Sequence, residues 1–451
     1  MSGIALALVV FLLMLVAVFL RIPIAAAMGG AGFFGTWYVL GSPAAPMAQL
    51  KTLSYETFSN QGLAIVPLFI LMGQIATRTG MSAALFRAAS DFLGHRKGGV
   101  AMASVGACAG FGAICGSSLA TASTMGQVAL PEMRKRGYSD SLSTGVLAAG
   151  GTLGILIPPS VILVIYAIMA EQNIVKMFVA ALVPGLLAAA GYMVTVAIYV
   201  RVRPGAATAA DRVPWAERLR TFGSTWPVIA IFGLTMGGIV GDWNWSKPGA
   251  QALFTPNEAA AFGATATALY GLFMGRLDWR GFGDALLETA KATGMIFLIL
   301  LGAEFFKGFL ALTRAPDLMA TWVTGQGFEP LIVLSLMLLA YLLFGCVMDS
   351  LSMILLTIPI FLPIIEVLDF GMTPEETAIW FGILALIVVE VGLITPPVGM
   401  NLFIINGVAR DIPIGRTYAG VAPFVLSDLV RVVLLVAFPS LTLWLVGAAV
   451  G

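Results

Sequence analysis

The sequence predicts an all-α polytopic membrane protein built from two inverted repeats, each containing a re-entrant hairpin and a broken helix. The first supporting observation is composition: 59% of the 451 residues are hydrophobic and only 10% are charged, whereas a soluble domain carries about 25% charged residues. The second is that Gly, Ser and Pro interrupt two long apolar stretches. The third is that both halves carry these interruptions in the same order.

Composition also excludes several classes of protein. A net charge of +1 argues against a nucleic-acid partner. The three cysteines, Cys108, Cys115 and Cys346, lie in apolar segments, which predicts small core residues and no disulfide framework. The only histidine is His95, so histidine-based metal or acid–base chemistry has little scope. The apolar run 2–20 lacks a basic n-region and a clear cleavage site, which favours a first span over a signal peptide.

Segments long enough to cross a membrane, which needs roughly 20 apolar residues, divide the chain into two repeats and a linker. The first repeat, 1–200, contains spans 2–20, 22–40 and 61–80, a hairpin at 98–136, a broken helix at 142–172 and a span at 174–200. A basic cytoplasmic linker follows at 201–225. The second repeat, 226–451, contains spans 226–241, 257–275 and 290–313, a hairpin at 329–366, a broken helix at 376–410 and a span at 418–449.

The two halves resemble each other in sequence. The segment LFILMGQIA at 68–76 aligns with FLILLGAEF at 297–305, and Pro158-Pro159 aligns with Pro396-Pro397. Five full crossings in the first half is an odd number, so the second copy starts from the opposite side and the repeats are inverted. Chance similarity between apolar helices is the alternative. The recurrence of hairpin and broken helix in the same order argues against it.

Basic residues predict the orientation. Placing 41–60 outside puts 18 of the 24 Lys and Arg residues on the inner side, as the positive-inside rule requires. The first hairpin then opens from the cytoplasm and the second from the outside.

The interruptions predict a binding site. The first pair is 116–118 with 151–160, and the second is 345–350 with 391–399. Irregular backbone at membrane depth requires protein or a water-filled cavity around it, and matched breaks in two halves indicate a transporter's binding site. Helix carbonyl ends coordinate a cation such as Na⁺, while N–H ends hold a carboxylate. The alternative, that these small residues only pack helices together, stays open for any single serine.

Acidic residues add a second set of hypotheses. Asp349 is the one acid at a predicted hairpin tip, where it could ligate a cation, accept a proton or cap the broken helix. Glu390, just before the second break, is a weaker candidate of the same kind. Asp428 and Arg431, at i and i+3 of the last span, are interpreted as a structural pair.

Four segments carry a family resemblance: GSSLATASTMGQVALPEMRKRGYS (116–139), GTLGILIPPSVILVIYA (151–167), GLITPPVGMNLFI (392–404) and YAGVAPFVLSDLVRVVLLVAFP (418–439). They resemble the large membrane subunit of tripartite ATP-independent periplasmic (TRAP) transporters, and the similarity covers nearly the whole chain. The resemblance implies Na⁺-coupled uptake of an organic acid, often a C4-dicarboxylate or sialic acid, across the cell inner membrane. It also implies an elevator-type fold like that of the divalent-anion/Na⁺ symporters, and no cofactor beyond the coupling Na⁺ ions.

The same resemblance implies partners and site residues. The partners are a periplasmic substrate-binding protein, which delivers and largely selects the substrate, and a small four-helix membrane subunit, expected here as a separate chain. The first sodium site would use Ser117, Ser118, Gly154, Ile157 and Pro158. The second would use Gly345, Asp349, Gly392, Thr395 and Val398. The substrate would lie near Ser118, Thr152, Ser350 and Pro397.

Two alternative functions differ from this one in what they require. A symporter that works without a binding protein, coupled to Na⁺ or to H⁺ through Asp349, is distinguished by its independence of an added binding protein. An intramembrane enzyme needs two facing aspartates or a motif such as H-E-x-x-H, and the sequence carries neither. We therefore expect no catalytic residues. The sequence does not identify the organic acid.

Overall fold

The computed structural model describes residues 3–241 and 252–449, and every regular element in these two ranges is a helix. The first half contains α1 (Gly3–Phe19), α2 (Ile24–Leu40), α3 (Ala44–Ser59), a 3₁₀ turn (Gln61–Ala64), α4 (Ile65–Arg78), α5 (Met81–Leu93), α6 (Gly99–Cys115), α7 (Ser118–Lys135), α8 (Asp140–Leu156), α9 (Val161–Met169) and α10 (Ile174–Val202).

A short connection leads into the second half. It contains a 3₁₀ turn (Pro204–Ala206), α11 (Trp215–Gly223), α12 (Trp226–Val240), α13 (Pro256–Phe273), α14 (Trp279–Thr313), α15 (Ala315–Gly325), α16 (Pro330–Gly345), α17 (Ser350–Glu366), α18 (Pro374–Gly392), α19 (Met400–Val408), α20 (Ile414–Ala437) and α21 (Ser440–Ala449).

Several of these helices have the length and composition of membrane spans. Four described helical stretches are long and apolar enough to cross a bilayer alone, namely Gln61–Arg78, Ile174–Val202, Trp279–Thr313 and Ile414–Ala437. The pair α8 and α9 qualifies as one span bent by 46°, and α11 with α12 as one bent by 52°. The helices of both hairpins are shorter, at 16 to 18 residues. The chain is a multi-pass membrane protein.

Five segments differ from the expectation drawn from hydropathy. Helices α3, α5, α11 and α15 occupy stretches where no span or hairpin is predicted. The predicted last span, 418–449, is divided into α20 and α21 at Pro439, where proline offers no N–H and its ring obstructs the preceding turn. The four short helices escaped prediction because none carries about 20 consecutive apolar residues.

The second half repeats the helix order of the first. Helices α6, α7, α8 and α9 have 17, 18, 17 and 9 residues, and α16 to α19 have 16, 17, 19 and 9. Each series is therefore a hairpin followed by a long and a short half of one interrupted helix. We call the segment between α6 and α7 the first tip (116–117) and that between α16 and α17 the second tip (346–349). The first break is 157–160, and the second break is 393–399.

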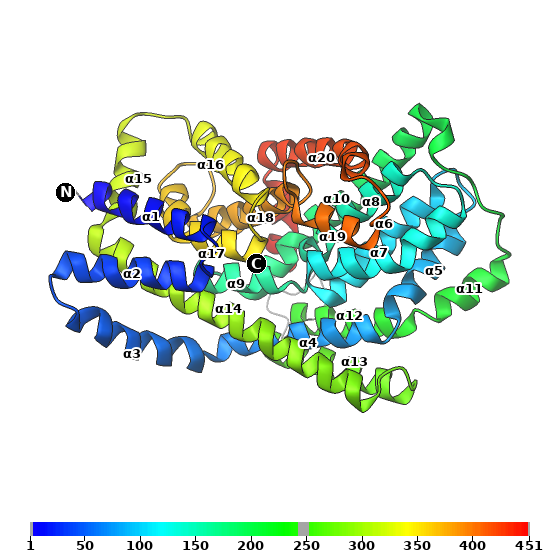
Figure 1. Cartoon of the computed structure of the whole chain (residues 1–451), viewed down its shortest axis with the longest axis horizontal. Coiled ribbons are helices and arrows are strands. Elements are labelled where there is room, and N and C mark those ends of the chain that lie inside the picture. The colour runs from blue at the N-terminus through cyan, green and yellow to red at the C-terminus, as the bar shows by residue number, and fades with distance from the viewer. Residues whose placement is uncertain (1–2, 242–251, 450–451) are drawn as a thin grey trace.

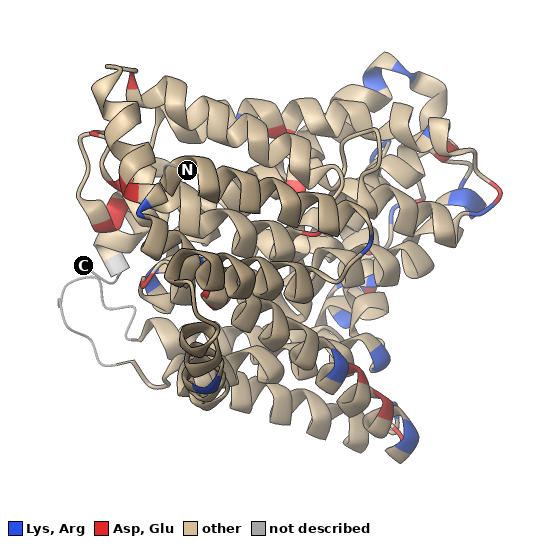
Figure 2. Cartoon of the chain, turned by 60° about the vertical axis from the view of Figure 1, so that its left-hand side comes forward, with Lys and Arg blue, Asp and Glu red and all other residues tan. Residues whose placement is uncertain are grey.

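Figure 1 shows how these parts are arranged. The yellow hairpin α16–α17 and the cyan hairpin α6–α7 lie on opposite sides of the centre, which α9, α18 and α19 occupy. Helices α2, α3 and α14 run along one side of the molecule. Helices α2 and α14 approach closely, because a Cβ at Gly32 would lie 2.4 Å from the Phe305 carbonyl carbon. In Figure 2 most Lys and Arg segments lie toward the right, away from both termini, as a charge-oriented membrane protein requires.

Candidate functional site

The first tip is a sharp turn between α6, which is mostly buried, and the N-terminal end of α7. Gly116 has a left-handed φ of 62°, which glycine adopts without steric cost. Ser117 then begins α7 as its N-cap, with its hydroxyl 3.4 Å from the Ala120 N–H. The first tip thus presents the N-terminus of α7, where backbone N–H groups lack helical partners.

The second tip ends in the same way with different chemistry. Asp349 is the N-cap of α17. Its carboxylate accepts hydrogen bonds from the backbone N–H of Ser352 at 3.0 Å and from the Ser352 hydroxyl. Of the three roles considered for Asp349, capping is the one that the geometry displays. Capping by aspartate is worth about 1 kcal/mol relative to alanine.

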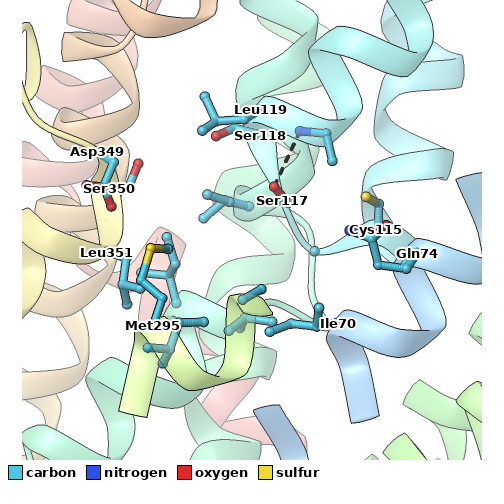
Figure 3. Close-up of a pocket in the computed structure, with 18 of the residues that line it drawn as sticks. Ile70, Gln74, Cys115, Ser117, Ser118, Leu119, Met295, Asp349, Ser350 and Leu351 are labelled. Atoms are coloured by element: carbon cyan, nitrogen blue, oxygen red, sulfur yellow. Dashed lines mark hydrogen bonds between the residues drawn. The ribbon is translucent and has the colours of Figure 1, made fainter. Parts of the chain in front are cut away.

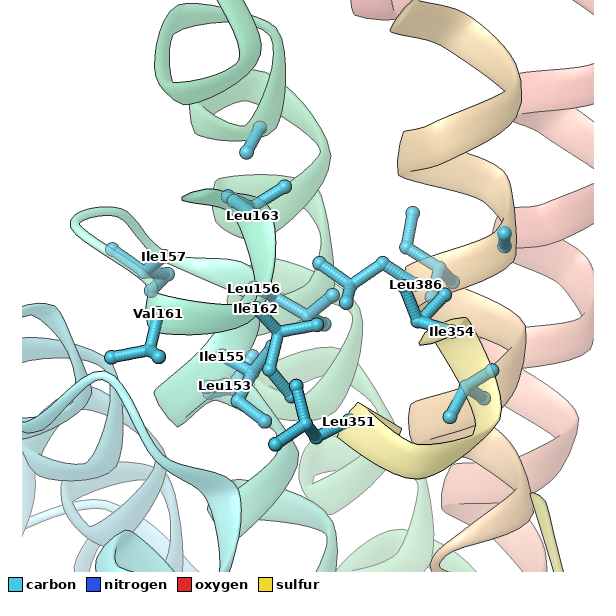
Figure 4. Packing of buried hydrophobic residues seen from close by; sticks show 14 of the residues in the cluster. Leu153, Ile155, Leu156, Ile157, Val161, Ile162, Leu163, Leu351, Ile354 and Leu386 are labelled. Carbon is cyan, nitrogen blue, oxygen red and sulfur yellow. The ribbon is translucent and has the colours of Figure 1, made fainter. Parts of the chain in front are cut away.

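The first break is buried throughout, from Ile157 to Ser160. It packs against the first tip, because a Cβ at Gly116 would lie 3.1 Å from the Pro159 carbonyl oxygen. The end of α8 packs there too, because a Cβ at Gly154 would lie 2.6 Å from the Ser117 carbonyl oxygen and 2.4 Å from the Thr121 hydroxyl. Only glycine permits that approach. On its other side, Ile155 and Ile162 pack near Leu351, just past the second tip (Figure 4).

The second break is held by hydrogen bonds from neighbouring elements. The Gly399 N–H donates to the Cys346 carbonyl at 3.0 Å, and the Tyr418 hydroxyl donates to the Pro397 carbonyl at 2.8 Å. The Thr395 hydroxyl donates to the Val391 carbonyl at 2.6 Å. Pro396 and Pro397 are exposed, so this break reaches the surface of the chain.

Both tips line one cavity of about 220 Å³. Figure 3 shows Ser117 and Ser118 facing Asp349 and Ser350 across it. The residues that line the cavity come from α4, the first tip, the first break's flanks, α14, the second tip and the second break: Ile70, Gly73, Gln74, Cys115, Gly116, Ser117, Ser118, Leu119, Ala120, Ile155, Val161, Ile162, Ala292, Met295, Ile296, Asp349, Ser350, Leu351 and Leu393. The N-termini of α7 and α17 therefore meet at one space.

Three hydroxyl oxygens around the first tip lack hydrogen-bond partners. Ser118, Thr121 and Ser160 are 1%, 0% and 0% exposed, and within the described residues their hydroxyl groups have no hydrogen-bond partner of good geometry, although Ser118 lies near the Glu390 carboxyl group and Thr121 near the Cys115 thiol. A buried hydroxyl without a partner costs about 1–3 kcal/mol, so native proteins rarely retain one without a reason. Oxygen atoms free to bind are what a hard cation such as Na⁺ needs.

Glu390 connects the second tip to the broken helix α18. Its side chain is fully buried, and its Oε1 accepts a hydrogen bond of 2.5 Å from the Ser350 hydroxyl. Its Oε2 has no hydrogen-bond partner. Ser118 of α7 and the Asp428–Arg431 pair of α20 also lie close enough to influence this carboxyl group. Glu390 therefore lies close to both hairpins. It is a stronger candidate for a functional residue than its position in the sequence indicates.

The predicted pair at Asp428 and Arg431 is confirmed. Arg431 Nη2 lies 2.9 Å from Asp428 Oδ1, and both side chains are buried. The Tyr192 hydroxyl donates to Asp428 Oδ2 at 2.7 Å and lies 3.0 Å from the Thr152 hydroxyl. This network ties the end of α8 to α10 and α20. Thr152 therefore faces α10 and does not line the cavity.

The remaining residues expected to bind Na⁺ or substrate fall into two groups. Ser117, Ser118, Asp349 and Ser350 line the shared cavity, and Gly154 packs directly behind Ser117. The others contribute no atoms to the cavity lining: Ile157, Pro158, Gly345, Gly392, Thr395, Pro397 and Val398. Gly345 and Gly392 meet where α16 crosses α18, since a Cβ at Gly392 would lie 2.6 Å from the Gly345 carbonyl carbon.

Sequence reasoning missed Thr121, Ser160 and Asn401. Asn401 begins α19 beyond the second break, is fully buried, and has no partner for its Oδ1. Its Nδ2 lies 3.4 Å from the Ala148 carbonyl of α8, so it joins the two broken helices. Thr121 could have been found, because it follows Ser117 by four residues and so shares its helix face. Nothing in the local pattern marks Asn401.

Metal chemistry based on histidine, cysteine and carboxylate clusters finds no support in the described ranges, which contain no group of three or more such residues placed to hold a metal ion. Cys108, Cys115 and Cys346 are free and buried, as predicted. The polar groups at the cavity are instead hydroxyls, the Gln74 amide, one carboxylate and helix N-termini.

Comparison with known proteins gives a consistent result. A sequence profile described as "Tripartite ATP-independent periplasmic transporter, DctM component" matches residues 11–441. The C4-dicarboxylate TRAP transporter large permease protein DctM of Pseudomonas aeruginosa is 35% identical over 391 residues, covering 86% of this chain and 87% of that protein. The sialic acid large permease SiaM of Vibrio cholerae is 31% identical, with 86% of both chains covered.

Two further matches concern length and fold. The isethionate TRAP transporter permease protein DctMQ of Oleidesulfovibrio alaskensis is 32% identical over 86% of this chain but only 58% of its own length. Among solved structures, the Alcanivorax borkumensis YdaH transporter superposes with a TM-score of 0.63 over 88% of this chain and 89% of that one, at 16% identity. At that identity the likeness concerns the fold alone.

Proposed function

Because this chain belongs to the DctM component family of the tripartite ATP-independent periplasmic transporters, we propose that it carries out Na⁺-coupled uptake of an organic acid across the cytoplasmic membrane. In this proposal a periplasmic binding protein delivers the substrate, and a small membrane subunit assists the chain. Related proteins bear names for C4-dicarboxylates, sialic acid, isethionate and ectoine. The family therefore leaves the particular solute open.

The observation that carries the proposal is the cavity shared by the two tips. Each tip comes from a different half of the chain, and each begins a helix at the same 220 Å³ space. This volume lies below the roughly 300–1,000 Å³ of typical ligand pockets, which favours a small solute. The N-terminus of α7, which the neutral Ser117 caps, carries positive dipole character and suits a carboxylate, whereas the Asp349 carboxylate already caps that of α17.

The free hydroxyl groups support the coupling ion. Ser118, Thr121 and Ser160 supply buried oxygens without partners beside the first tip, and the carbonyl of Ser117 lies against Gly154. Neutral oxygen ligands suit an ion that must bind and then leave. Moving one elementary charge through 100 mV is worth about 2.3 kcal/mol, so carrying more Na⁺ charge than substrate charge would drive uptake.

Alternating access is proposed to follow an elevator motion. The moving part would contain α6 to α9 and α16 to α19 with the helices α10 and α20 that pack on them, and the frame would contain α2, α3, α13 and α14. Helix α4 touches the moving part where a Cβ at Gly73 would lie 2.7 Å from the Cys115 carbonyl. Small residues at such a contact permit two backbones to slide past each other.

Uptake by proteoliposomes tests the proposal. The chain and its small membrane subunit are reconstituted with a binding protein whose ligand has been identified by a thermal-shift screen of succinate, sialic acid, isethionate and ectoine. Accumulation of the radiolabelled ligand should require an inward Na⁺ gradient and should increase with an inside-negative potential. Unchanged accumulation without the gradient would reject Na⁺ coupling, and accumulation without the binding protein would favour a symporter that works alone.

A further inference from the structure

A buried carboxyl group, that of Glu390, lies behind the serines that follow the two tips. The Ser350 hydroxyl donates to Glu390 Oε1 at 2.5 Å, and Ser118 lies close enough to influence the same carboxyl group. The two serines occupy equivalent places in the two halves, because each is the first residue of the second helix of its hairpin. Both line the shared cavity and face each other across it (Figure 3), whereas Glu390 is 0% exposed and does not line it.

On the side of the first tip, a donor and an acceptor are both unused. The Ser118 hydroxyl and Glu390 Oε2 are buried, and neither has a hydrogen-bond partner of good geometry within the described residues. An unpaired buried polar atom costs free energy, so a small movement that pairs these two groups is favourable. The bond from Ser350 to Oε1 already shows the arrangement that Ser118 would adopt at Oε2.

The chemistry of a hydroxyl group explains why such an acceptor matters to a cation site. A hydroxyl has one proton and two lone pairs. When its oxygen ligates a cation, the proton must be directed away from the ion, toward an acceptor behind the hydroxyl. Groups outside the ligand shell that fix the orientation of the ligands in this way tune metal affinity. Glu390 is such an acceptor for Ser350 and offers its second oxygen to Ser118.

The sequence similarity between the halves identifies the residue that stands next to Glu390. Glu390 and Thr152 each precede the proline pair of their half by six residues. Arg431 and Tyr192 each follow the internal proline of α20 and α10 by eight residues. In the first half, the Thr152 and Tyr192 hydroxyls lie 3.0 Å apart. The equivalent contact in the second half is between Glu390 and Arg431.

Arg431 is available to share its charge with Glu390. Its Nη2 lies 2.9 Å from Asp428 Oδ1, but its Nε and Nη1 have no hydrogen-bond partner within the described residues. A buried carboxylate needs a counter-charge nearby, and Arg431 is close enough to influence Glu390. Two carboxylates and one guanidinium leave one net negative charge, which a cation in the cavity would balance.

We propose that Glu390 is the positioning residue of the cation site. Ser118 and Ser350 donate their hydroxyl protons to the ionised Glu390 carboxylate and direct their oxygen lone pairs toward a Na⁺ ion in the shared cavity. Glu390 itself does not touch the ion, and Arg431 supplies its counter-charge. This inference rests on the proposed Na⁺ coupling and adds to it the residue that prepares the ligands from both halves of the chain.

Na⁺ binding to the detergent-purified transporter tests the proposal. The melting temperature is measured during a titration with NaCl, with choline chloride keeping the ionic strength constant. Glu390→Gln preserves the side-chain volume but replaces one acceptor oxygen by an N–H₂ donor. Its half-saturating Na⁺ concentration should rise about 10- to 100-fold, as is typical when a group that orients metal ligands is removed. Glu304→Gln, at a partly buried carboxyl group of α14, is the matched control and should respond to Na⁺ as the parent does.

A double-mutant cycle shows whether Glu390 acts through the two serines. In the serine variant, Ser118→Ala/Ser350→Ala, there is no hydroxyl left to orient. Adding Glu390→Gln to the serine variant should therefore weaken Na⁺ binding no further. A further loss as large as in the parent would overturn the proposal, because a structural role or direct ligation of Na⁺ by Glu390 does not depend on the serines.

Infrared difference spectra provide a second measurement that needs no change at Glu390. Replacing choline by Na⁺ should shift carboxylate stretching bands of the parent, because the hydrogen bonds to Glu390 change, and the serine variant should lack this shift. Parent-like Na⁺ affinity of Glu390→Gln, or identical bands in the parent and the serine variant, would overturn the proposal and leave Na⁺ coupling intact. A parent protein that does not respond to Na⁺ would instead overturn the proposed coupling together with this inference.

Discussion

The two hairpin tips share a helix order but differ in how their polar groups are used. Around the first tip, the hydroxyls of Ser118 and Thr121 are buried without partners. At the second tip, Asp349 accepts bonds from Ser352, and Ser350 donates to Glu390. The first tip is therefore arranged to receive atoms from outside the chain. The second tip holds itself together, and a ligand there must compete with internal hydrogen bonds.

The two breaks differ from each other in the same way as the two tips do. The first break is buried on all sides, whereas Pro396 and Pro397 of the second are exposed. At the second break, the Pro397 carbonyl already accepts a hydrogen bond, and the Gly399 N–H already donates to the Cys346 carbonyl of the second tip. The two halves have helices of similar length, but their tips and breaks are therefore not equally free to bind a ligand. If the proposed function holds, we expect a cation site at the first tip to be preformed and one at the second tip to require rearrangement of that tip.

The largest effect should follow from removing a free hydroxyl at the first tip. Thr121→Val deletes an oxygen without a partner, so the protein should gain about 1 kcal/mol of stability while its apparent Na⁺ affinity in proteoliposome uptake falls at least about tenfold. Thr442→Val is the matched control, because Thr442 is equally buried and unpartnered but lies on α21. It should raise the melting temperature and leave Na⁺ dependence unchanged. Equal Na⁺ affinity in both variants would remove Thr121 from the site.

A backbone contact at the second tip should give the next largest effect. Gly392→Ala places a Cβ 2.6 Å from the Gly345 carbonyl carbon, and overpacking of this kind costs about 1–3 kcal/mol. The melting temperature of the detergent-purified protein should fall. Gly407→Ala on α19 is the control: no atom lies within 4 Å of its Cβ, so the higher helix propensity of alanine should stabilise by up to about 1 kcal/mol. An unchanged melting temperature for Gly392→Ala would mean that α16 and α18 are not closely packed.

Breaking the hydrogen bond between Ser350, just after the second tip, and Glu390 of α18 should lower stability somewhat less than Gly392→Ala does. Ser350→Ala leaves both Glu390 carboxylate oxygens without the hydroxyl partner, at about 1–2 kcal/mol. Uptake should also fall in this variant, because the second tip loses its hydrogen bond to the broken helix. Ser335→Ala on α16, whose exposed hydroxyl bonds only to the Leu331 carbonyl, is the control and should retain uptake. Full uptake by Ser350→Ala would show that the Ser350–Glu390 bond is dispensable for transport.

Much of the fold could be predicted because hydrocarbon forces the backbone into helices, so that each interruption is informative. The hairpins at 98–136 and 329–366 correspond to α6–α7 and α16–α17 for this reason. Helices α3, α5, α11 and α15 were missed since short, partly polar helices leave no such signal. That the two repeats are inverted stays a prediction, as do the ligands of Na⁺ and substrate.

The candidate site could be predicted only in part. The sequence shows which residues are unusual in their segment, but it does not show which residues contact them in the folded protein. Gly116 and Ser117 stand out within an apolar run. Glu390 lies 40 residues from Ser350, and only the packing of α17 on α18 brings them together. Thr152 appeared to belong to the cavity but turns toward Tyr192 instead. Tertiary contacts determine where these side chains lie, and the spacing of residues along the chain does not reveal those contacts.

The smallest effect concerns an ion pair that joins the end of α7 to the segment after α19. Arg134, at the end of α7, donates to both oxygens of Asp411 at 2.8 Å, beyond the end of α19. The Arg134 side chain holds the pKa of Asp411 below its ordinary value, mainly through this hydrogen bond. Because the folded pKa is lowered, the stabilisation is present above the unfolded pKa and disappears as the pH falls through the folded one.

The pair is exposed, so its contribution should be small and visible only by comparison. Asp411→Asn should melt slightly below the parent protein at pH 7, and the difference should shrink as the pH falls below the ordinary aspartate pKa and then through the lowered pKa of folded Asp411. Glu132→Gln is the control, since its ion pair with Arg136 lies within the α7 end and joins no second element. A difference between Asp411→Asn and the parent that persists unchanged at low pH would show that packing at Asp411, and not its charge, links the first hairpin to the second broken helix.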